Sequence, residues 1–370
     1  MKAKPINIFV DCHVLDGSYQ GTTTYIKGLY SEAIKDKRFN FYFAANDINR
    51  LQQTFGESVN VYYIKYPVIN KYFRLLFAIP YLIKKYEIDY AHFQYIVPPI
   101  KLCKYINTIH DILFMDYPEF FPESYKLRNK FLFSWSAKKS NIVATVSSYS
   151  SARLAHHFGI DSIITPNAVN PDYYESYDKK TILNQVKVTY GFDKYWLYVS
   201  RWEPRKNHHS LLRCFTENKY YKNYHLVLAG YNDITNHWFN EVYSKLSAEI
   251  KSKIVILGGV TASELMLLTR GASLSIYPSL AEGFGIPPLE SAAAGIPTAC
   301  SNTTAMSDFT FFGDTLFDPN SGSEMQNAIE AALNNNNIKD IQHIISEKYR
   351  WDLSASILLE AIVENSCNAV

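Results

Sequence analysis

The chain of 370 residues is 47% hydrophobic, so it is long and apolar enough to bury two separate cores. Its formal net charge is only +2, which argues against a general nucleic-acid-binding protein. The five cysteines are scattered without a CxxC pair, no apolar run could span a bilayer, and the N-terminus lacks the apolar core of a signal peptide, so we expect a cytoplasmic protein with reduced thiols.

Short apolar runs in the first half of the chain alternate with longer segments of mixed character. The runs predict strands of a parallel sheet, and the segments between them predict the helices that cover it. The expected strands cover residues 6–10, 39–45, 59–65, 90–93, 104–109 and 141–146. The expected helices cover residues 25–34, residues 72–86 with an interruption near Pro80, and a segment that ends at His157.

The second half repeats this alternation after a polar stretch, residues 170–194, that we expect to be a linker. Its strands are expected at residues 195–200, 225–229, 254–257 and 272–278, and its helices at 208–215, 238–250, 262–269 and from Pro287 onward. The predicted fold class is therefore α/β, with two Rossmann-like domains facing across a cleft, at residues 1–170 and 190–350. Ligands of such sheets bind beyond the carboxyl ends of the strands.

A loop with two glycines, residues 17–24, follows the first strand. It could bring backbone amides close to a phosphate, although a lone GxxxG spacing is weak evidence. It does not match the GxGxxG fingerprint of dinucleotide-binding proteins, which argues against a dehydrogenase.

His110 and Asp111 stand at the end of the apolar strand over residues 104–109. A histidine there could hydrogen-bond a sugar hydroxyl, or it could be a structural histidine whose partners lie within the fold. Asp111 would orient His110 or the loop rather than act as a nucleophile.

Three cations, Arg201, Arg205 and Lys206, follow the first strand of the second half. At a strand end before a helix they form a plausible clamp for a diphosphate, because Arg binds phosphate bidentately and Lys supplies a mobile point charge. Seen alone, the same cluster would be a solvated basic loop. We assign no definite role to Arg205.

Two carboxylates, Glu282 and Glu290, bracket a Gly-Phe-Gly turn and the start of a helix with two prolines. A helix N-terminus after a glycine turn attracts anions, because its free N–H groups point outward. Carboxylates beside it would repel a phosphate unless they accept hydrogen bonds from hydroxyls. A ligand with both phosphates and sugar hydroxyls, a sugar nucleotide, satisfies both demands.

This segment resembles the E-x7-E motif of retaining glycosyltransferases of the GT-B fold, family 4, and the resemblance extends along nearly the whole chain. It implies that Glu282 lies by the donor sugar, that Glu290 binds the ribose, and that the turn amides of Phe284, Gly285 and Ile286 contact the donor. It also implies further roles for residues elsewhere, namely Arg201 and Lys206 on the diphosphate, His110 beside the sugar, Gly21 in the glycine-rich loop, and a last helix within residues 351–370 that crosses back to the first domain.

The function that these residues and this resemblance predict is retaining, front-face transfer of a hexosyl group from a nucleotide diphosphate sugar to a glycan or lipid-linked glycan. Residues 109–121 and 301–306 resemble bacterial mannosyltransferase-like members that build surface polysaccharide, which favours GDP-mannose as the donor. The alternatives are a sugar-nucleotide epimerase of the same fold and a catalytically idle protein that binds nucleotide sugars. No DxD triplet is present and adjacent histidines point to different faces, so we expect neither a catalytic metal nor a cofactor.

Basic and large apolar residues are mixed over residues 71–85. This segment could lie on an anionic bilayer surface, or it could be a helix packed on its own sheet. The first interpretation predicts a peripheral contact with the cytoplasmic face of the inner membrane.

Overall fold

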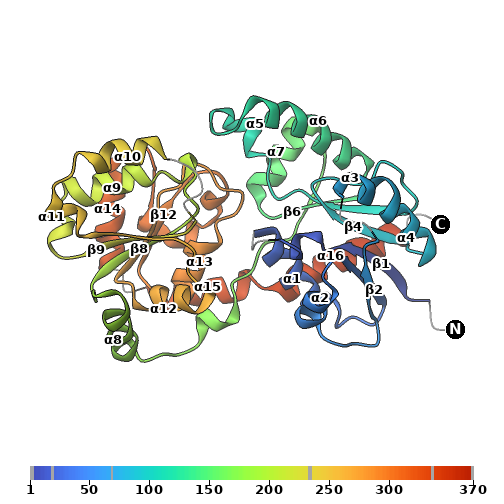
Figure 1. The fold of residues 1–370 in the computed structure, drawn as a ribbon, viewed down its shortest axis with the longest axis horizontal. Coiled ribbons are helices and arrows are strands. Elements are labelled where there is room, and N and C mark those ends of the chain that lie inside the picture. Colours follow the sequence, from blue (N-terminus) through green and yellow to red (C-terminus); the bar gives the residue numbers. More distant parts are fainter. Residues whose placement is uncertain (1–3, 18–20, 68–69, 232–235, 335–336, 368–370) are drawn as a thin grey trace. The chain divides into compact units, whose positions relative to one another are not determined.

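The computed structural model describes residues 4–17, 21–67, 70–231, 236–334 and 337–367. The chain divides into two compact units, each an α/β structure around a parallel sheet (Figure 1). Unit 1 consists of Met1–Ala168 together with Arg350–Val370, and unit 2 is Val169–Tyr349. Two Rossmann-like α/β units are the fold class that the sequence predicts.

Within the described residues, unit 1 has seven strands in the order β3-β2-β1-β4-β5-β6-β7, all parallel. They are β1 (Ile6–Asp11), β2 (Phe39–Ala45), β3 (Val61–Lys65), β4 (Tyr90–Gln94), β5 (Lys104–Thr108), β6 (Ile142–Thr145) and β7 (Ile163–Ile164). The chain reverses its direction of strand addition between β1 and β4. The carboxyl ends at that point are where a ligand of unit 1 is expected.

Helices cover both faces of this sheet because its strands alternate their side chains between the faces. On one face, Tyr30 of α1 (Gly21–Ala33) packs against Phe41 and Phe43 of β2. On the other face, α4 (Ile79–Lys85) contributes to a core with Phe9 of β1 and other strand residues. The remaining helices of unit 1 are α2 (Ile48–Phe55), α3 (Lys71–Phe73), α5 (Leu113–Asp116), α6 (Glu123–Lys139), α7 (Ser148–Phe158) and α16 (Trp351–Cys367).

The expected interruption near Pro80 lies just before that residue. The chain forms α3, then a π-helical turn, η2 (Arg74–Ala78), and then α4, in which Pro80 stands in the first turn. A proline in the first turn removes no hydrogen bond from its own helix, while the π turn absorbs the mismatch with the preceding residues. The segment therefore continues with a change of winding instead of stopping.

Within the described residues, unit 2 has six parallel strands in the order β10-β9-β8-β11-β12-β13. They are β8 (Tyr195–Val199), β9 (His225–Ala229), β10 (Ile254–Leu257), β11 (Leu274–Tyr277), β12 (Thr298–Ser301) and β13 (Leu316–Phe317). The reversal of strand order falls between β8 and β11. The helices of unit 2 are α8 (Lys179–Tyr190), α9 (His208–Glu217), α10 (His237–Ser244), α11 (Ala248–Lys251), α12 (Ala262–Gly271), α13 (Ile286–Ala293), α14 (Gly322–Leu333) and α15 (Ile338–Lys348).

Two expectations for unit 2 are wrong. The polar stretch 170–194 is not a plain linker, because it contains α8, which begins at its cap Asp178, ends at Gly191 in the left-handed conformation, and buries Val186. The single helix expected over residues 238–250 is two helices, α10 and α11, because Ser247 caps a new helix by accepting the backbone N–H of Ile250.

Candidate active site

The carboxyl ends of β8 and β11 lie side by side, since Leu274 of β11 pairs with Trp196 of β8. The loop after β8 contains the short helix η5 (Pro204–Lys206), and the loop after β11 leads into α13. A backbone hydrogen bond from Leu280 N to Arg205 O, 2.8 Å long, joins the two loops. The basic loop and the two glutamates thus meet at the switch point of the unit 2 sheet, where α/β proteins bind ligands.

Glu282 is the centre of a partly buried ion-pair cluster. Its Oε1 lies 2.5 Å from Lys206 Nζ, and its Oε2 lies 3.1 Å from Arg205 Nη1. Ser279 Oγ donates a further hydrogen bond of 2.8 Å to Oε1. Each carboxylate oxygen therefore has a cationic partner, which fixes the side chain above the strand ends.

The cluster extends from Glu282 toward solvent. Arg205 Nη2 lies 2.6 Å from Glu203 Oε2, and Arg201 Nε lies 3.8 Å from Glu203 Oε1. Three cations and two carboxylates thus gather at this edge of the sheet. The side chain of Arg201 is 53% exposed, whereas that of Lys206 is 13% exposed, so a ligand reaches Arg201 first.

Burial alone would raise the pKa of Glu282, but Lys206 and Arg205 outweigh it and lower this pKa to about 2. The carboxylate is therefore ionised throughout the physiological pH range. Glu282 also holds Lys206, one of the two cations that the resemblance assigns to a diphosphate, so such a ligand would compete with this side chain or share its partner.

Arg205, to which the sequence assigned no role, belongs to this cluster. Its Nη1 donates a hydrogen bond of 2.7 Å to Ala281 O and also contacts Glu282. The side chain therefore points into the site rather than away from it. Its charge type and neighbours in the sequence are compatible with either orientation. Only the fold brings the loop after β11 within its reach.

The turn after Glu282 needs glycine at position 285. Gly285 has φ of +99°, and a Cβ atom there would lie 2.8 Å from Met306 Cγ. Phe284 is buried and packs against Phe309 and Tyr349, with ring centroids 6.0 and 5.8 Å apart. The side chain of Phe284 therefore anchors the turn, so only its backbone is left to contact a ligand. Ile286 begins α13 directly after the turn.

Glu290 lies on α13 and differs from Glu282 in having no hydrogen-bond or ion-pair partner for its carboxylate among the residues that the structure describes. Burial raises the pKa of Glu290 to about 7. Glu290 is half-buried, and a carboxylate in such a place is stabilised when a ligand supplies hydrogen-bond donors. Hydroxyl groups of a sugar would do so.

The other two predicted site residues, His110 and Gly21, belong to unit 1. His110 follows β5, its Nε2 lies 2.5 Å from Gln94 Oε1, and its ring packs against Tyr25 with centroids 4.9 Å apart. Burial lowers the pKa of His110 to about 3, so the imidazole is neutral and acts as a hydrogen-bonding group, not as a cation. Asp111 accepts a hydrogen bond of 3.2 Å from Leu113 N.

Gly21 is the first residue of α1 and is exposed. The preceding residues of the glycine-rich loop, 18–20, lie outside the described residues. Thr23 stands where a second glycine is common in the resembling family. Its Oγ1 donates a hydrogen bond of 3.0 Å to Val14 O, which ties α1 to the loop after β1.

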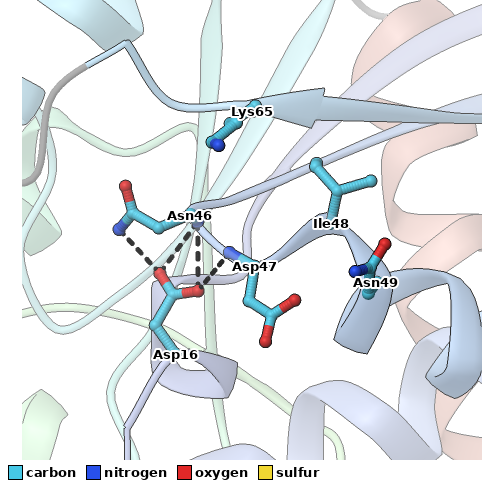
Figure 2. A pocket seen from close by; sticks show the side chains of 6 residues that line it. All are labelled: Asp16, Asn46, Asp47, Ile48, Asn49 and Lys65. Carbon is cyan, nitrogen blue, oxygen red and sulfur yellow. Dashed lines mark hydrogen bonds between the residues drawn. The ribbon is translucent and has the colours of Figure 1, made fainter.

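Unit 1 also contains an open cavity of about 390 Å³ at the carboxyl ends of β1, β2 and β3 (Figure 2). Asp16 forms one wall and accepts hydrogen bonds of 2.9 to 3.0 Å from Asn46 and Asp47. The cavity is lined by Asp16, Asn46, Asp47, Ile48, Asn49 and Lys65. Such a mixture of amides, carboxylates and one aliphatic side chain suits a polar ligand with hydroxyl groups.

Solved structures with the same fold include glycosyltransferases. A glycosyltransferase from Rickettsia africae superposes with a TM-score of 0.73 at 17% identity, over 98% of this chain and 99% of that one. WaaG, a glycosyltransferase involved in lipopolysaccharide biosynthesis, superposes with a TM-score of 0.68 at 16% identity, over 97% and 99%. At these identities the likeness establishes the fold, GT-B.

Family models decide the class. The model of Glycosyltransferase Family 4 matches residues 20–173, and that of Glycosyl transferases group 1 matches residues 179–351. The chain belongs to the GT-B glycosyltransferases. O-antigen chain mannosyltransferase B of Escherichia coli is 28% identical over 266 residues, 68% of either chain, and O-antigen chain mannosyltransferase RfbU of Salmonella typhimurium is 28% identical over 227 residues, 60% of this chain and 59% of that one.

As a member of this class, the glycosyltransferase described here is a hexosyltransferase. In the described part of the chain, no helix is both long and apolar enough to cross a membrane. Among the same residues, the His, Cys, Asp and Glu side chains form no group of three that could hold a metal ion.

Proposed function

We propose that unit 2 binds a nucleotide diphosphate sugar and that the enzyme transfers the hexosyl group to a glycan acceptor with retention of configuration. The observation that carries this proposal is the pairing of two features at one sheet edge. Three cations gather at the carboxyl ends of β8 and β11, and α13, which follows the loop after β11, carries the half-buried Glu290, whose carboxylate has no partner among the described residues. The first feature suits a diphosphate, and the second suits ribose hydroxyls.

Lys206 and Arg201 would stabilise the negative charge that grows on the leaving diphosphate, which is the main electrostatic demand of glycosyl transfer. Arg205, which already contacts Glu282, would hold that carboxylate when the diphosphate takes over Lys206. Glu282 and the amides of Phe284, Gly285 and Ile286 would orient the sugar. Neutral His110 of unit 1 would offer a hydrogen bond rather than a charge.

The proposed reaction needs no covalent nucleophile from the protein. The acceptor hydroxyl would attack the sugar on the face from which the diphosphate leaves, and a phosphate oxygen would take its proton. Residues near the reacting atoms would then act by position and charge, which agrees with an ionised Glu282 held by two cations.

GDP-mannose is the donor that we propose, and a polysaccharide of the bacterial surface is the proposed product. The support is the presence of O-antigen mannosyltransferases of Escherichia coli and Salmonella typhimurium among the relatives. Solved structures of the fold include HepE in complex with UDP and glucose, so the fold by itself does not select the base.

The test is a calorimetric panel of GDP, UDP, ADP and their hexose conjugates, followed by turnover measurements with the preferred donor. We expect a preference for GDP and GDP-mannose, and a loss of turnover of about 100-fold or more in Lys206→Ala and Glu290→Ala with the fold intact. The control is Lys222→Ala, which should keep wild-type turnover. Lys222 is exposed and precedes β9, at the opposite end of the sheet from the site.

Each other result has a definite meaning. Wild-type turnover in both variants would overturn the site assignment. Preference for UDP would overturn the mannose donor while leaving the transfer reaction. Conversion of the donor into an isomeric nucleotide sugar without any acceptor would reveal an epimerase, and donor binding without turnover across a set of acceptors would favour an idle binding protein.

We further propose that unit 1 contacts an anionic membrane surface through α3, η2 and α4 together with α6. Large apolar side chains of this region are exposed instead of packed on the sheet, namely Tyr72, Phe73, Phe77, Tyr81, Leu127 and Phe131. Lysines and arginines stand among them, including Lys71, Lys84, Lys85, Arg128 and Lys130. Exposed aromatic and basic residues together are typical of surfaces that bind anionic lipids.

A further inference from the structure

Arg74 is a buried arginine whose side chain has no hydrogen-bond partner in the described part of the chain. It lies on the π turn η2, and only 6% of its surface is exposed. Its guanidinium makes no side-chain hydrogen bond to any residue that the structure describes, and its Nε is completely buried. The guanidinium carries five N–H donors, and the one on Nε is buried without an acceptor among the described residues.

Asp11 is the carboxylate that pairs with Arg74, but it accepts no hydrogen bond from the guanidinium. Arg74 Nη2 lies 3.8 Å from Asp11 Oδ2, which is an ion pair beyond hydrogen-bonding distance. The other oxygen of Asp11 accepts hydrogen bonds from Tyr66 OH at 2.7 Å and from His13 N at 3.2 Å. Asp11 therefore has closer partners of its own, and it offsets the charge of Arg74 without using its donors.

The position of this guanidinium is that of a ligand site. Asp11 is the last residue of β1, beside the point at which the order of strands in unit 1 reverses. The face of Arg74 is held by the ring of Tyr66, 5.6 Å from the guanidinium carbon. A side chain fixed from one side, with donors left over at the carboxyl ends of the strands, is prepared for an anion.

Further positive charge surrounds the same place. Lys71 precedes Arg74 by one helical turn, and its side chain is exposed. Partial desolvation and the charges of Arg74 and Arg128 lower the pKa of Lys71. Arg128 of α6 thus lies close enough to Lys71 to influence it. Positive charge from three side chains thus gathers in this part of unit 1, with Asp11 as the counter-charge of Arg74.

We propose that Arg74, with Lys71 and Arg128 at its rim, binds a phosphate group carried by the acceptor. This inference rests on the proposed function, in which unit 1 receives the acceptor. It narrows the acceptor class to glycans that carry a phosphate or diphosphate, such as a glycan joined to a lipid through a diphosphate. The guanidinium would bind two phosphate oxygens, and Asp11 would keep it oriented.

A purely structural ion pair is a weaker explanation of Arg74. Such a pair stabilises a fold when the geometry is close and the remaining donors are satisfied. Here the charges are 3.8 Å apart and the donors are free of partners among the described residues. A role in binding accounts for both facts.

The test measures binding of farnesyl diphosphate to the full chain by calorimetry, with GDP at saturation so that the cations of unit 2 are occupied. We expect Arg74→Met to weaken this binding by about 10- to 100-fold, the effect of losing one or two charge-assisted hydrogen bonds. Lys71→Ala and Arg128→Ala should each weaken it by a few-fold. Lys27→Ala, which removes an exposed lysine of α1, should leave it unchanged.

Unchanged binding of farnesyl diphosphate in Arg74→Met would overturn the proposal. If Arg74→Met does not fold, the double variant Lys71→Glu with Arg128→Glu replaces it, because both residues are exposed, and wild-type affinity in that variant would equally overturn the site. Vesicles of phosphatidylglycerol form a second arm. Binding to these vesicles, but not to farnesyl diphosphate, would show that the cations serve a lipid headgroup and not the acceptor.

The proposed function and this inference fail separately. A missing preference for GDP-mannose would appear in the donor panel and would leave the comparison of Arg74 variants intact. Conversely, if the affinity for farnesyl diphosphate does not change in Arg74→Met, this inference fails, but the donor site with Lys206 and Glu290 is unaffected.

Discussion

At the scale of single residues, the two glutamates of the motif over residues 282–290 have opposite electrostatic environments. Glu282 is ionised because two cations hold its carboxylate, and they lower its pKa to about 2 despite burial. Glu290 has no such partner, and burial raises its pKa to about 7. The spacing of the pair is visible in the sequence, but this division of their properties follows from what each side chain faces.

We predict that nucleotide affinity depends on pH through Glu290. Accepting hydrogen bonds from ribose favours the ionised carboxylate, whereas below pH 7 the free protein holds a proton there. Between pH 8 and pH 6 the ionised fraction of Glu290 falls by about tenfold, so the affinity should fall by the same factor. Calorimetry in two buffers of different ionisation enthalpy should detect the release of a proton on binding at pH 6.

Glu290→Gln separates this effect from titration of the nucleotide phosphate itself. The variant should bind more weakly at pH 8 and should lose the part of the pH dependence that belongs to the carboxylate. An identical pH profile in the variant and the wild type would contradict the assignment of this titration to Glu290.

At the scale of elements, the close packing of α1 and α16 depends on one glycine. A Cβ atom at Gly28 of α1 would lie 2.0 Å from Trp351 Cε2, at the start of α16. Ser354 Oγ of α16 also donates a hydrogen bond of 2.7 Å to Pro166 O. The last helix of the chain is thus part of the structure of unit 1, although more than 180 residues of unit 2 separate it from Ala168.

We predict that Gly28→Ala destabilises unit 1 by about 1–3 kcal/mol, as an overpacked core does. Ordinarily alanine stabilises a helix relative to glycine, so the sign of the change tests the contact with Trp351. Urea unfolding measures it, and donor binding by unit 2 should persist at low urea.

Gly322→Ala in α14 is the control, because no atom lies within 4 Å of a Cβ there. Relief of the defect by Trp351→Leu in the same chain would confirm that the clash is with this ring. Equal stability of Gly28→Ala and the wild type would mean that α1 and α16 pack less closely than described.

At the scale of the whole molecule, the proposed membrane contact assigns a surface to unit 1 that the donor chemistry does not require. Phe73 and Phe77 are 57% and 61% exposed, and their rings lie 5.6 Å apart. Paired exposed aromatic rings beside lysines are costly in water and favourable at a lipid interface.

We predict that the protein floats with vesicles that contain phosphatidylglycerol and not with vesicles of phosphatidylcholine alone. Phe73→Ser combined with Phe77→Ser should reduce flotation by about tenfold, in line with the apolar area lost. Val188→Ser, which changes an exposed apolar residue of α8 in unit 2, serves as the control. Equal flotation of the double variant and the control would contradict the proposed surface.

Several elements were predictable because they are short, almost wholly apolar runs of the chain. The strands at Phe39–Ala45, His225–Ala229 and Ile254–Leu257 have the predicted bounds, since apolar runs of this kind have few alternatives. The helix α8 was missed because its segment is largely polar and buries only Val186, although Ile182, Val186 and Tyr190 recur at helical spacing. Its caps, Asp178 and Gly191, were the available signal.

The sequence by itself determined the class of the fold, the alternation of strands and helices, and the residue types gathered at strand ends, because these depend on local pattern and on burial. Only the tertiary structure decided which charges meet. It placed Arg205 against Glu282, gave Glu290 no partner among the residues described, and buried Arg74 beside Asp11. These contacts join residues far apart in the chain, and the strength of a charge in a protein depends on the neighbours and the burial that the fold gives it.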